Sequence, residues 1–303
     1  MNHISPRRAL VTGATGYLGG QLVKRLAENG WTVGVMGRRS QRQLNFQENN
    51  TDIKCYFATD CVEAMSAAMT DLSPSIVFHC AAMTSADTAG VSSRELIDAN
   101  LLFGTNVLNA MAEAEIKHFV NVGSYWEHYN NEEFNPVDLY AASKYAFSNI
   151  LKFFTEAHDL TACTLELNDV YGTNDSRGKI ISLLIEATMN GGQLRMSPGH
   201  QRLNFVYISD VLDGFLTLAN RMLINSPRLA DRYALRSNND FSLRETAKII
   251  EDVVGKKLMV DWGAFGYKKR TIMTPPDITP VLDCWQSKIT LREGLKYVVE
   301  SFN

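Results

Sequence analysis

A glycine-rich turn between a short apolar strand and a helix constrains the fold of this chain most. The apolar residues 9–11 are followed by Gly13, Gly16 and Gly19 at three-residue spacing. Glycine tolerates the positive φ of a tight turn, and N–H groups at a helix N-terminus bind the pyrophosphate of a dinucleotide. The spacing differs from the G-x-G-x-x-G fingerprint, so a glycine-rich turn without a ligand is the alternative. The stretch predicts cofactor contacts at Gly13, Thr15, Gly16, Tyr17, Leu18 and Gly19.

Composition and charge narrow the class of protein. The chain has 303 residues, enough for a large domain with a smaller lobe, and its net charge is −3. This charge gives no support for a nucleic-acid polymer or an anionic membrane as a partner. Apolar runs stay below the ~20 residues of a membrane span, and we expect no signal peptide. The five cysteines lack metal-site spacing, so we expect a reducing cytoplasm, core cysteines and no metal.

Strands and helices alternate six times over the first part of the chain. After the first strand, apolar runs predict strands at 32–36, 54–58, 75–80, 118–122 and 163–167. Helical patterns lie between them at 17–29, 62–72, 94–114 and 138–158. This alternation is typical of the α/β class and predicts a Rossmann-type, doubly wound parallel sheet.

The second part of the chain has a more irregular pattern. It predicts helices at 179–189, 211–222, 243–254 and 291–302, with a strand at 203–208. Ser242 and Glu245 have the spacing of a capping box for the third of these helices. We therefore expect residues 1–172 to form the cofactor domain, with return segments from the C-terminal half. Residues 173–303 are expected to form a smaller α/β lobe that binds the substrate.

Ligands of doubly wound sheets bind beyond the carboxyl ends of the strands. After the second strand the chain carries Arg38, Arg39 and Ser40, and the range 32–47 contains no acidic residue. An acidic residue there would bind the ribose 2′-hydroxyl, whereas arginines suit a 2′-phosphate. This pattern favours NADP over NAD, with a solvated basic turn as the alternative. Further cofactor contacts are predicted at Asp60, Cys61, Ala81, Ala82, Asn100 and Leu167.

Tyr140 and Lys144 are four residues apart on a predicted helix and therefore share a face. A phenol titrates near ~10, and a nearby ammonium favours its ionised form. Ser124, at the end of the fifth strand, can donate a hydrogen bond to a substrate oxygen as charge develops there. These three residues form a candidate catalytic set, and Tyr140 and Lys144 also reach the cofactor. The alternative is a half-buried tyrosine beside a surface lysine. We expect His79 to be a core residue.

Six motifs together resemble the extended short-chain dehydrogenase/reductases that act on nucleotide sugars. They are TGATGYLG (12–19), VFHCAA (77–82), Asn100-x-x-x-Gly-Thr, GSYW (123–126), YAASK (140–144) and LNDVYG (167–172). The stretches 123–147 and 171–179 are most similar to CDP-sugar 4-ketoreductases of the abequose and paratose synthase kind. The resemblance implies NADPH-dependent reduction of the C4 keto group of a 4-keto-6-deoxy nucleotide sugar, CDP-linked. It also implies a homodimer in which helices 94–114 and 138–158 form a four-helix bundle.

The chain departs from the family pattern in several places. Counting back four residues from Tyr129 gives Tyr125 rather than Ser124 for the catalytic Ser/Thr position. The acid pair of the family's 4,6-dehydratases is replaced by Trp126-Glu127, which argues against dehydration. The family's phosphate-binding arginine corresponds to Leu203, with Arg202 next to it, and Arg177 is a substitute or a plain surface residue. Substrate contacts are predicted at Thr84, Tyr125, Trp126, Asp169, Arg177 and Lys179.

Two other functions fit the same motifs. A nucleotide-sugar 4-epimerase would keep NAD bound and regenerate it in each cycle. A non-catalytic NADP-binding sensor would need the cofactor site but neither Tyr140 nor Lys144. The nucleotide, the sugar and the stereochemistry at C4 are encoded by no motif.

Overall fold

The computed structural model describes residues 7–38, 40–50, 52–57, 61–84, 92–224 and 229–302. Contacts divide the chain into two compact units. The first unit comprises Met1–Ser124, Asp138–Leu165 and Phe215–Tyr233. The second unit comprises Tyr125–Val137, Glu166–Gly214 and Ala234–Asn303. Residues 215–233 are a return segment to the first unit, whereas residues 125–137 belong to the second unit although they precede residue 172.

A seven-stranded sheet is built in the order β11-β6-β5-β4-β1-β2-β3. Its strands are β1 (Arg8–Thr12), β2 (Thr32–Gly37), β3 (Lys54–Phe57), β4 (Ile76–His79), β5 (His118–Ser124), β6 (Thr161–Leu167) and β11 (Arg232–Leu235). Strand β1 pairs in parallel with β2 and β4, and the pairs β2–β3 and β4–β5 are also parallel. The order 3-2-1-4-5-6 is that of the doubly wound Rossmann sheet. The predicted fold class is therefore confirmed.

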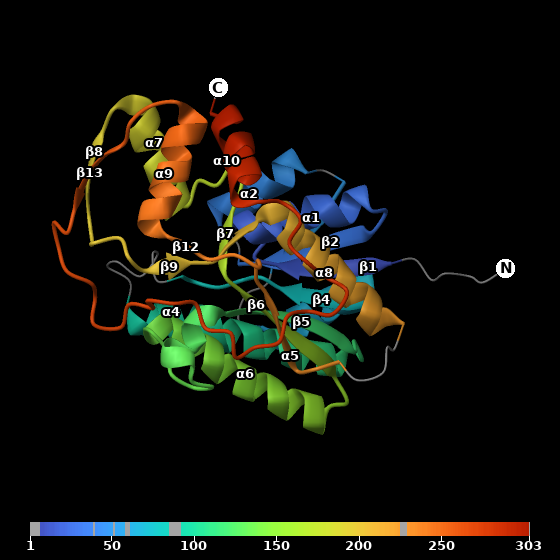
Figure 1. Ribbon diagram of the computed structural model, residues 1–303. Coiled ribbons are helices and arrows are strands. Elements are labelled where there is room, and N and C mark those ends of the chain that lie inside the picture. Colours follow the sequence, from blue (N-terminus) through green and yellow to red (C-terminus); the bar gives the residue numbers. More distant parts are fainter. Residues whose placement is uncertain are drawn as a thin grey trace. The chain divides into compact units, whose positions relative to one another are not determined.

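Helices cover both faces of this sheet in the first unit. They are α1 (Tyr17–Glu28), α2 (Gln41–Asn49), α3 (Val62–Leu72), α4 (Ser93–Ile97), α5 (Phe103–Glu113), α6 (Leu139–Ala157) and the end of α8 (Ile208–Leu223). Figure 1 shows α5 and α6, which pack against each other. In β4, His79 contacts the rings of Phe103 and Phe147 from α5 and α6. Its neighbour Phe78 contacts Phe215 of α8. Because successive strand residues point to opposite faces, α8 lies on the face away from α5 and α6.

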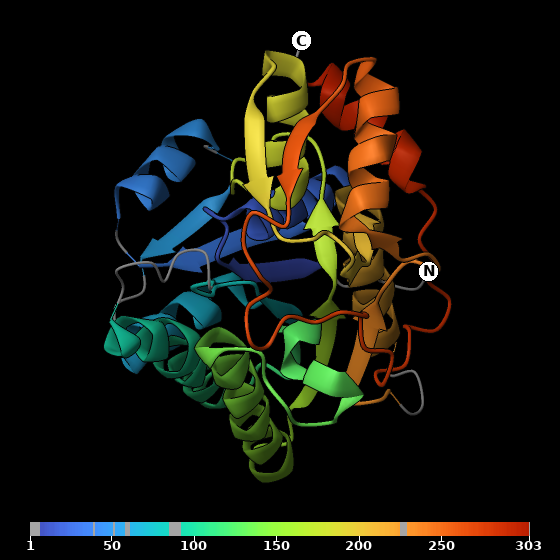
Figure 2. The same cartoon turned by 60° about the vertical axis from the view of Figure 1, so that its left-hand side comes forward.

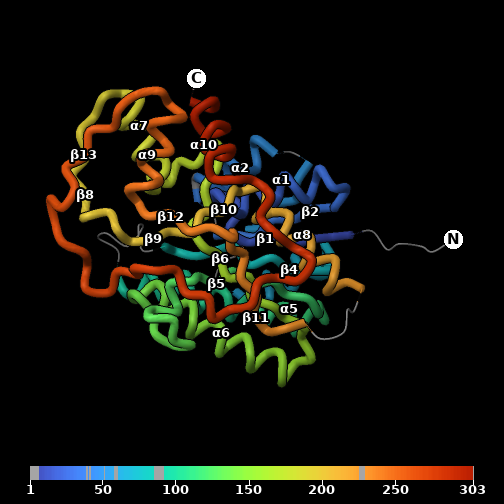
Figure 3. Tube along the Cα trace, viewed as in Figure 1, coloured from blue at the N-terminus to red at the C-terminus, as the bar shows by residue number. Residues whose placement is uncertain are grey.

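In the residues that the structure describes, the second unit contains three two-stranded pairings and three further α-helices, besides two short 3-10 helices within 125–131 and the start of α8. The pairs are β7 (Asp169–Tyr171) with β10 (Phe205–Tyr207), β9 (Arg202–Leu203) with β12 (Phe241–Ser242), and β8 (Gln193–Met196) with β13 (Met259–Trp262). The helices are α7 (Ile180–Asn190), α9 (Leu243–Val254) and α10 (Leu291–Glu300). In Figure 2, β8 (yellow) and β13 (orange) run side by side in parallel. Figure 3 follows the long segment between β13 and α10. The predicted capping box of Ser242 and Glu245 is present.

Two predicted elements are divided in the structure. The predicted helix 94–114 consists of α4, a π-helical turn (Asp98–Leu102) and α5. Asn100 lies in the π-turn, where its side chain bonds the backbone N–H and C=O of Met83. The predicted strand 203–208 is divided into β9 and β10 at Asn204. The Asn204 side chain forms hydrogen bonds with Ser237 and Asp240.

The cysteine side chains differ in their exposure. All five cysteines are free thiols, but only Cys163 is buried. The expectation of core cysteines is wrong for Cys61 and Cys284, which are exposed. Within the described ranges, no helix has the length and apolar character needed to span a membrane.

Candidate active site

The glycine turn is packed against the end of β4. Gly13 has φ +72°, and a Cβ there would lie 2.6 Å from the amide nitrogen of Ala81. A Cβ on Gly19 would lie 2.3 Å from the carbonyl oxygen of Gly13. Both positions therefore exclude any side chain. Gly13 also accepts a hydrogen bond from the N–H of Gly16, at 3.0 Å, which closes the turn.

Gly16 stands at the N-cap of α1, and no side chain among the described residues caps this helix. Thr15 and Gly16 are exposed, Tyr17 and Leu18 are half-buried, and Gly19 is buried. The turn lies at the carboxyl end of β1, between β4 and β2. This is where the order of the strands reverses, the usual ligand position of doubly wound sheets. An uncapped helix N-terminus behind a turn without side chains fits a dinucleotide pyrophosphate.

Thr12 and His79 join the ends of β1 and β4. The Thr12 hydroxyl oxygen accepts the N–H of Ala81 at 3.2 Å and lies 2.9 Å from Nδ1 of His79. His79 is 1% exposed. Burial, followed by the positive charge of Lys144, lowers the pKa of His79 to about 3. His79 is therefore a neutral core residue, as predicted.

The candidate catalytic residues come from β5 and from the first turns of α6, which contact each other. Ser124 is the last residue of β5 and is buried, whereas Tyr140 on α6 is half-buried. Lys144 is 3% exposed. Its charge also lowers the pKa of Cys80, opposing the larger effect of burial, which raises that pKa to about 12. The ammonium therefore acts at the end of β4, where the glycine turn is also packed. A surface position for Lys144 is excluded.

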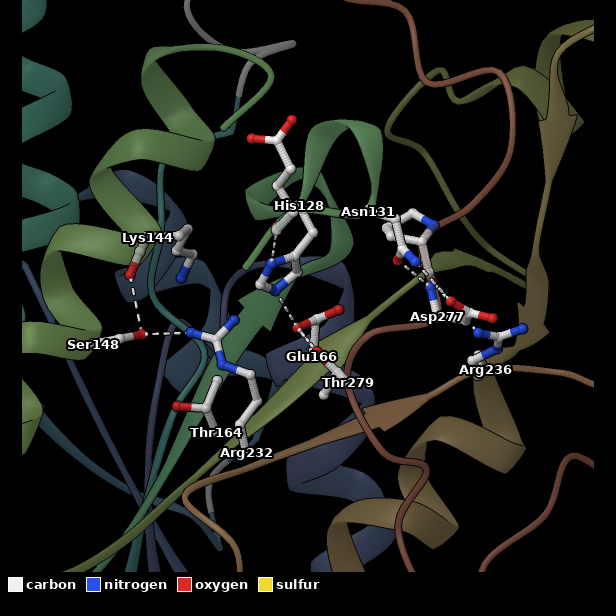
Figure 4. Close-up of polar contacts among 12 residues, drawn as sticks. His128, Asn131, Lys144, Ser148, Thr164, Glu166, Arg232, Arg236, Asp277 and Thr279 are labelled. Atoms are coloured by element: carbon white, nitrogen blue, oxygen red, sulfur yellow. Dashed lines mark hydrogen bonds and ion pairs between the residues drawn. The ribbon is translucent and has the colours of Figure 1, made fainter. Parts of the chain in front are cut away.

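A residue of β11 is joined to α6 by hydrogen bonds. A guanidinium N–H of Arg232 donates to the hydroxyl of Ser148 at 3.1 Å (Figure 4). Ser148 in turn donates to the carbonyl of Lys144 at 3.4 Å. This chain of bonds reaches the turn of α6 that carries Lys144.

The predicted adenosine contacts are only partly described. Arg38 follows β2 and is exposed, while Arg39 and Asp60 lie outside the described residues. Ser40 is the N-cap of α2, a helix missing from the sequence-based assignment, and its hydroxyl accepts the N–H of Gln43. Cys61 is exposed, and its thiol donates to Glu63 at 3.1 Å.

The remaining cofactor candidates differ in their environment. Ala82 is exposed and Leu167 is buried. Asn100 is 2% exposed, and besides Met83 it contacts the hydroxyl of Ser143 on α6 at 2.9 Å. These bonds favour a packing role for Asn100, in which it joins the segment after β4 to the helix of Tyr140 and Lys144.

Tyr125 and Asp169 form a pair in the second unit. The Tyr125 hydroxyl donates to Oδ2 of Asp169 at 3.0 Å. Burial, followed by the Asp169 charge, raises the pKa of Tyr125 well above its usual value. Asp169 is surrounded by protein on most sides, and this burial raises its pKa to about 6, against the favourable effects of Tyr125, Lys179 and Arg177. The hydroxyl of Tyr125 is thus occupied by Asp169, which favours Ser124 for the catalytic hydroxyl.

The other substrate candidates are distributed over both units. Trp126 stacks edge-on to Tyr125, with 6.4 Å between ring centroids. Lys179 is the N-cap residue of α7, and Thr84 lies in the first unit, half-buried. The guanidinium of Arg177 is held by Asp175 through two bonds of 2.7 Å. Arg202 pairs with Glu245 at 3.5 Å. Neither arginine charge is therefore unpaired.

Several residues that shape the site were missed in the sequence. Thr12 and Ser143 have no sequence signal, because a hydroxyl residue is common in both strands and helices. Glu166 did offer one, since it is a charged residue within the otherwise uncharged stretch 163–167. It is buried and bonded to His128 and Thr279.

The chain belongs to the NAD dependent epimerase/dehydratase family, whose sequence profile matches residues 9–227. It is thus an extended short-chain dehydrogenase/reductase and an enzyme of the NAD(P)-dependent oxidoreductase type. It is 26% identical to a CDP-abequose synthase of Yersinia pseudotuberculosis over 88% of this chain and 91% of the relative. It is 25% identical to a UDP-glucose 4-epimerase of Mycolicibacterium smegmatis, covering 97% and 98%. Its fold matches the structure of a Thermus thermophilus UDP-glucose 4-epimerase with a TM-score of 0.81, at 20% identity, covering 97% and 98%.

The pKa of Asp169 predicts a pH-dependent stability. Because the folded value of about 6 exceeds the ordinary 3.8, burial of the charged carboxylate destabilises the fold once the pH rises through this range. Asp169→Asn keeps an acceptor for Tyr125 and removes the charge. We expect this variant to be more stable than the natural protein at pH 8, by at most ~3 kcal/mol, with the gain shrinking at pH 4.5.

Thermal unfolding at both pH values measures this effect. Asp159→Asn is the matched control, since the Asp159 side chain is 98% exposed and should show no such pH dependence. A variant of Asp169 that gains as much stability at pH 4.5 as at pH 8 contradicts the prediction.

Proposed function

We propose that this protein uses NADPH to reduce the C4 keto group of a CDP-linked 4-keto-6-deoxy sugar. The observation that carries the proposal is the buried ammonium of Lys144, one helical turn from Tyr140 and acting at the end of β4 beside the glycine turn. A buried cation next to a phenol at a cofactor cradle suits proton transfer to a developing alkoxide. The cytidine nucleotide and the 4-keto sugar are supported by similarity to CDP-abequose synthases.

Each candidate site residue named below from the first unit has a role in this reaction. Gly13, Gly16 and the N-terminus of α1 hold the pyrophosphate of the dinucleotide, which supplies the hydride when bound. Tyr140 donates its proton to the C4 oxygen of the substrate. Lys144 stabilises the phenolate that remains, because a nearby positive charge favours the ionised form. Ser124 donates a hydrogen bond to the same substrate oxygen.

The second unit supplies all candidate substrate contacts except Thr84, which belongs to the first unit. Asp169 offers a carboxylate acceptor to the sugar hydroxyls, and Tyr125, which donates its proton to Asp169, offers its hydroxyl oxygen as a second acceptor. Trp126 offers an apolar ring face, on which sugars and bases pack well. The positive charges of Lys179 and Arg177 act on Asp169. Lys179 suits a diphosphate nearby, whereas the charge of Arg177 is paired with Asp175.

A 4-epimerase is the second candidate, favoured by the similarity to UDP-glucose 4-epimerases in sequence and fold. Such an enzyme would retain NAD and return the hydride to the same sugar. The two functions differ in whether the cofactor is consumed. Arg38, with no acidic residue in the range 32–47, supports an exchanging NADP.

Replacing Tyr140 by Phe tests the proposed proton donor. We expect turnover of a CDP-4-keto-6-deoxy sugar to fall by about 10²- to 10⁴-fold, because the acid is lost. The affinity for NADPH, measured by fluorescence titration, should stay unchanged. Tyr145→Phe, on the same helix, is the control with full turnover. Retained turnover in Tyr140→Phe would contradict the assignment of Tyr140 as the proton donor.

Replacing Arg38 by Ala tests the choice of cofactor. We expect the KM for NADPH to rise about tenfold or more, because a charge-assisted bond to the 2′-phosphate is lost. The KM for NADH should not change. Lys24→Ala removes an exposed positive charge from α1 and serves as control. Equal changes for both cofactors, or NAD that copurifies and is never consumed, would favour the epimerase.

We propose further that the protein forms a homodimer through α4, the π-turn and α6. Phe147, Leu151 and Phe154 on α6 are core residues of the first unit, so they are not available to a partner. Leu139 and Phe153 on the same helix are 51% and 57% exposed. Fourteen residues separate them, so they lie within about 40° of each other around the helix axis. Ile97 and Leu102 add exposed apolar side chains beside α6.

A charge in this apolar face should separate the subunits. We expect Phe153→Lys to run as a monomer and the natural protein as a dimer in size-exclusion chromatography with light scattering, since a buried unpaired charge is costly. Ile224→Lys changes another exposed apolar residue, 74% exposed, and should remain dimeric. A dimeric Phe153→Lys variant would exclude this interface.

A further inference from the structure

Glu166 is a buried carboxylate that joins all three chain segments of the second unit. It is 2% exposed on β6. Its Oε2 lies 2.9 Å from Nε2 of His128 and accepts the hydroxyl of Thr279 at 2.8 Å. Figure 4 shows Glu166 between these two residues. His128 comes from the segment 125–137 and Thr279 from the segment 234–303, so one carboxylate ties both to β6.

The hydrogen bonds of His128 fix the number of protons in this cluster. Nδ1 of His128 lies 3.1 Å from the carbonyl oxygen of Glu132, which can only accept. Nε2 faces the carboxylate of Glu166. A neutral imidazole has a single N–H and cannot donate to both. The pair therefore holds two protons, as imidazolium with carboxylate or as neutral imidazole with carboxylic acid, and a carboxylate bonded by Thr279 favours the ion pair.

Two cross-links connect the same stretches of chain. Glu166 contacts His128, and Asp169, three residues after Glu166, contacts Tyr125, three residues before His128. The Glu166–His128 link is buried on both sides, with 3% and 4% of the side chains exposed. It therefore restricts where the second link can lie.

The outer part of the segment 125–137 is held differently. Asn131 and Asp277 exchange two hydrogen bonds of 3.0 and 2.9 Å. Arg270 bonds Asn135 and lies 4.5 Å from the ring centroid of Tyr129. The Asn131–Asp277 contacts are exposed, so they are expected to contribute little compared with the buried pair.

We propose that the His128–Glu166 pair is a positioning element for the substrate sugar. It fixes the Tyr125 hydroxyl against the Asp169 carboxylate, and so sets the positions of the two oxygen acceptors that meet the hydroxyls of the sugar. The inference rests on the proposed function only in its substrate. The pair belongs to the second unit, whereas Ser124, Tyr140 and Lys144 belong to the first unit.

Glu166→Gln tests the proposal, because it keeps the side-chain size and an acceptor but abolishes the charge pair. We expect the KM for the CDP-sugar to rise about tenfold, with kcat within about threefold and the Kd of NADPH unchanged. Asp277→Asn changes only the exposed contact and should shift the KM by less than about twofold. An unchanged KM in Glu166→Gln, or an equal loss of NADPH affinity, overturns the proposal.

A cycle of variants without substrate gives a second readout. Tyr125→Phe should lower the Tm of the natural protein but should have no effect in the Glu166→Gln background, because the contact is no longer held there. If the changes in Tm of the two single variants add up in the double variant, the proposal is overturned. If Glu166→Gln does not fold, Thr279→Val removes one hydrogen bond to the Glu166 carboxylate and should give the same pattern at smaller size. A natural protein inactive on every nucleotide sugar contradicts the proposed function, and the Tm cycle then decides this inference by itself.

Discussion

The candidate active site depends on how closely the backbone approaches itself between β1 and β4. A Cβ on Gly13 would lie 2.6 Å from the amide nitrogen of Ala81, so no side chain can separate the two strand ends. Thr12 then accepts the N–H of Ala81, and Gly13 accepts the N–H of Gly16. The turn, the start of α1 and the segment after β4 consequently form one unit of fixed geometry. A cofactor bound there needs no reorganisation of the backbone, which lowers the entropic cost of binding.

Burial of the Lys144 charge is helped by neutral neighbours at the end of β4. His79 has a pKa of about 3 and stays uncharged near neutral pH, as does the thiol of Cys80. A protonated histidine at this place would repel the ammonium at short range in a poorly solvated site. The aromatic rings around His79 thus influence Lys144 indirectly, since they keep the imidazole dry. The bond from Arg232 to Ser148 holds the helix that carries the lysine.

Much of this architecture could be predicted from the sequence because it follows local rules. The glycine turn, the apolar strands and the capping box at Ser242 are encoded by neighbouring residues, and the strand order follows from the alternation of elements. The spacing of Tyr140 and Lys144 also placed both on one helix. The π-turn at Asn100 and the break at Asn204 could not be predicted, because side-chain bonds to distant backbone groups cause them. The partners of Glu166 lie 38 and 113 residues away, a pairing that no pattern in one sequence reveals.

The π-turn has a consequence for how this helix tolerates change. A π-turn contains one residue more than an α-helical path would need, and each residue turns a helix by about 100°. Phe103, Val107 and Met111 face the core only because the extra residue precedes them. Deleting one residue from 98–102 would leave a regular helix that is more favourable by local propensity. The residues after the deletion would, however, be rotated about the helix axis by a quarter turn or more and would no longer face the core. The number of residues in this helical segment is therefore set by the packing of the core rather than by the stability of the helix itself.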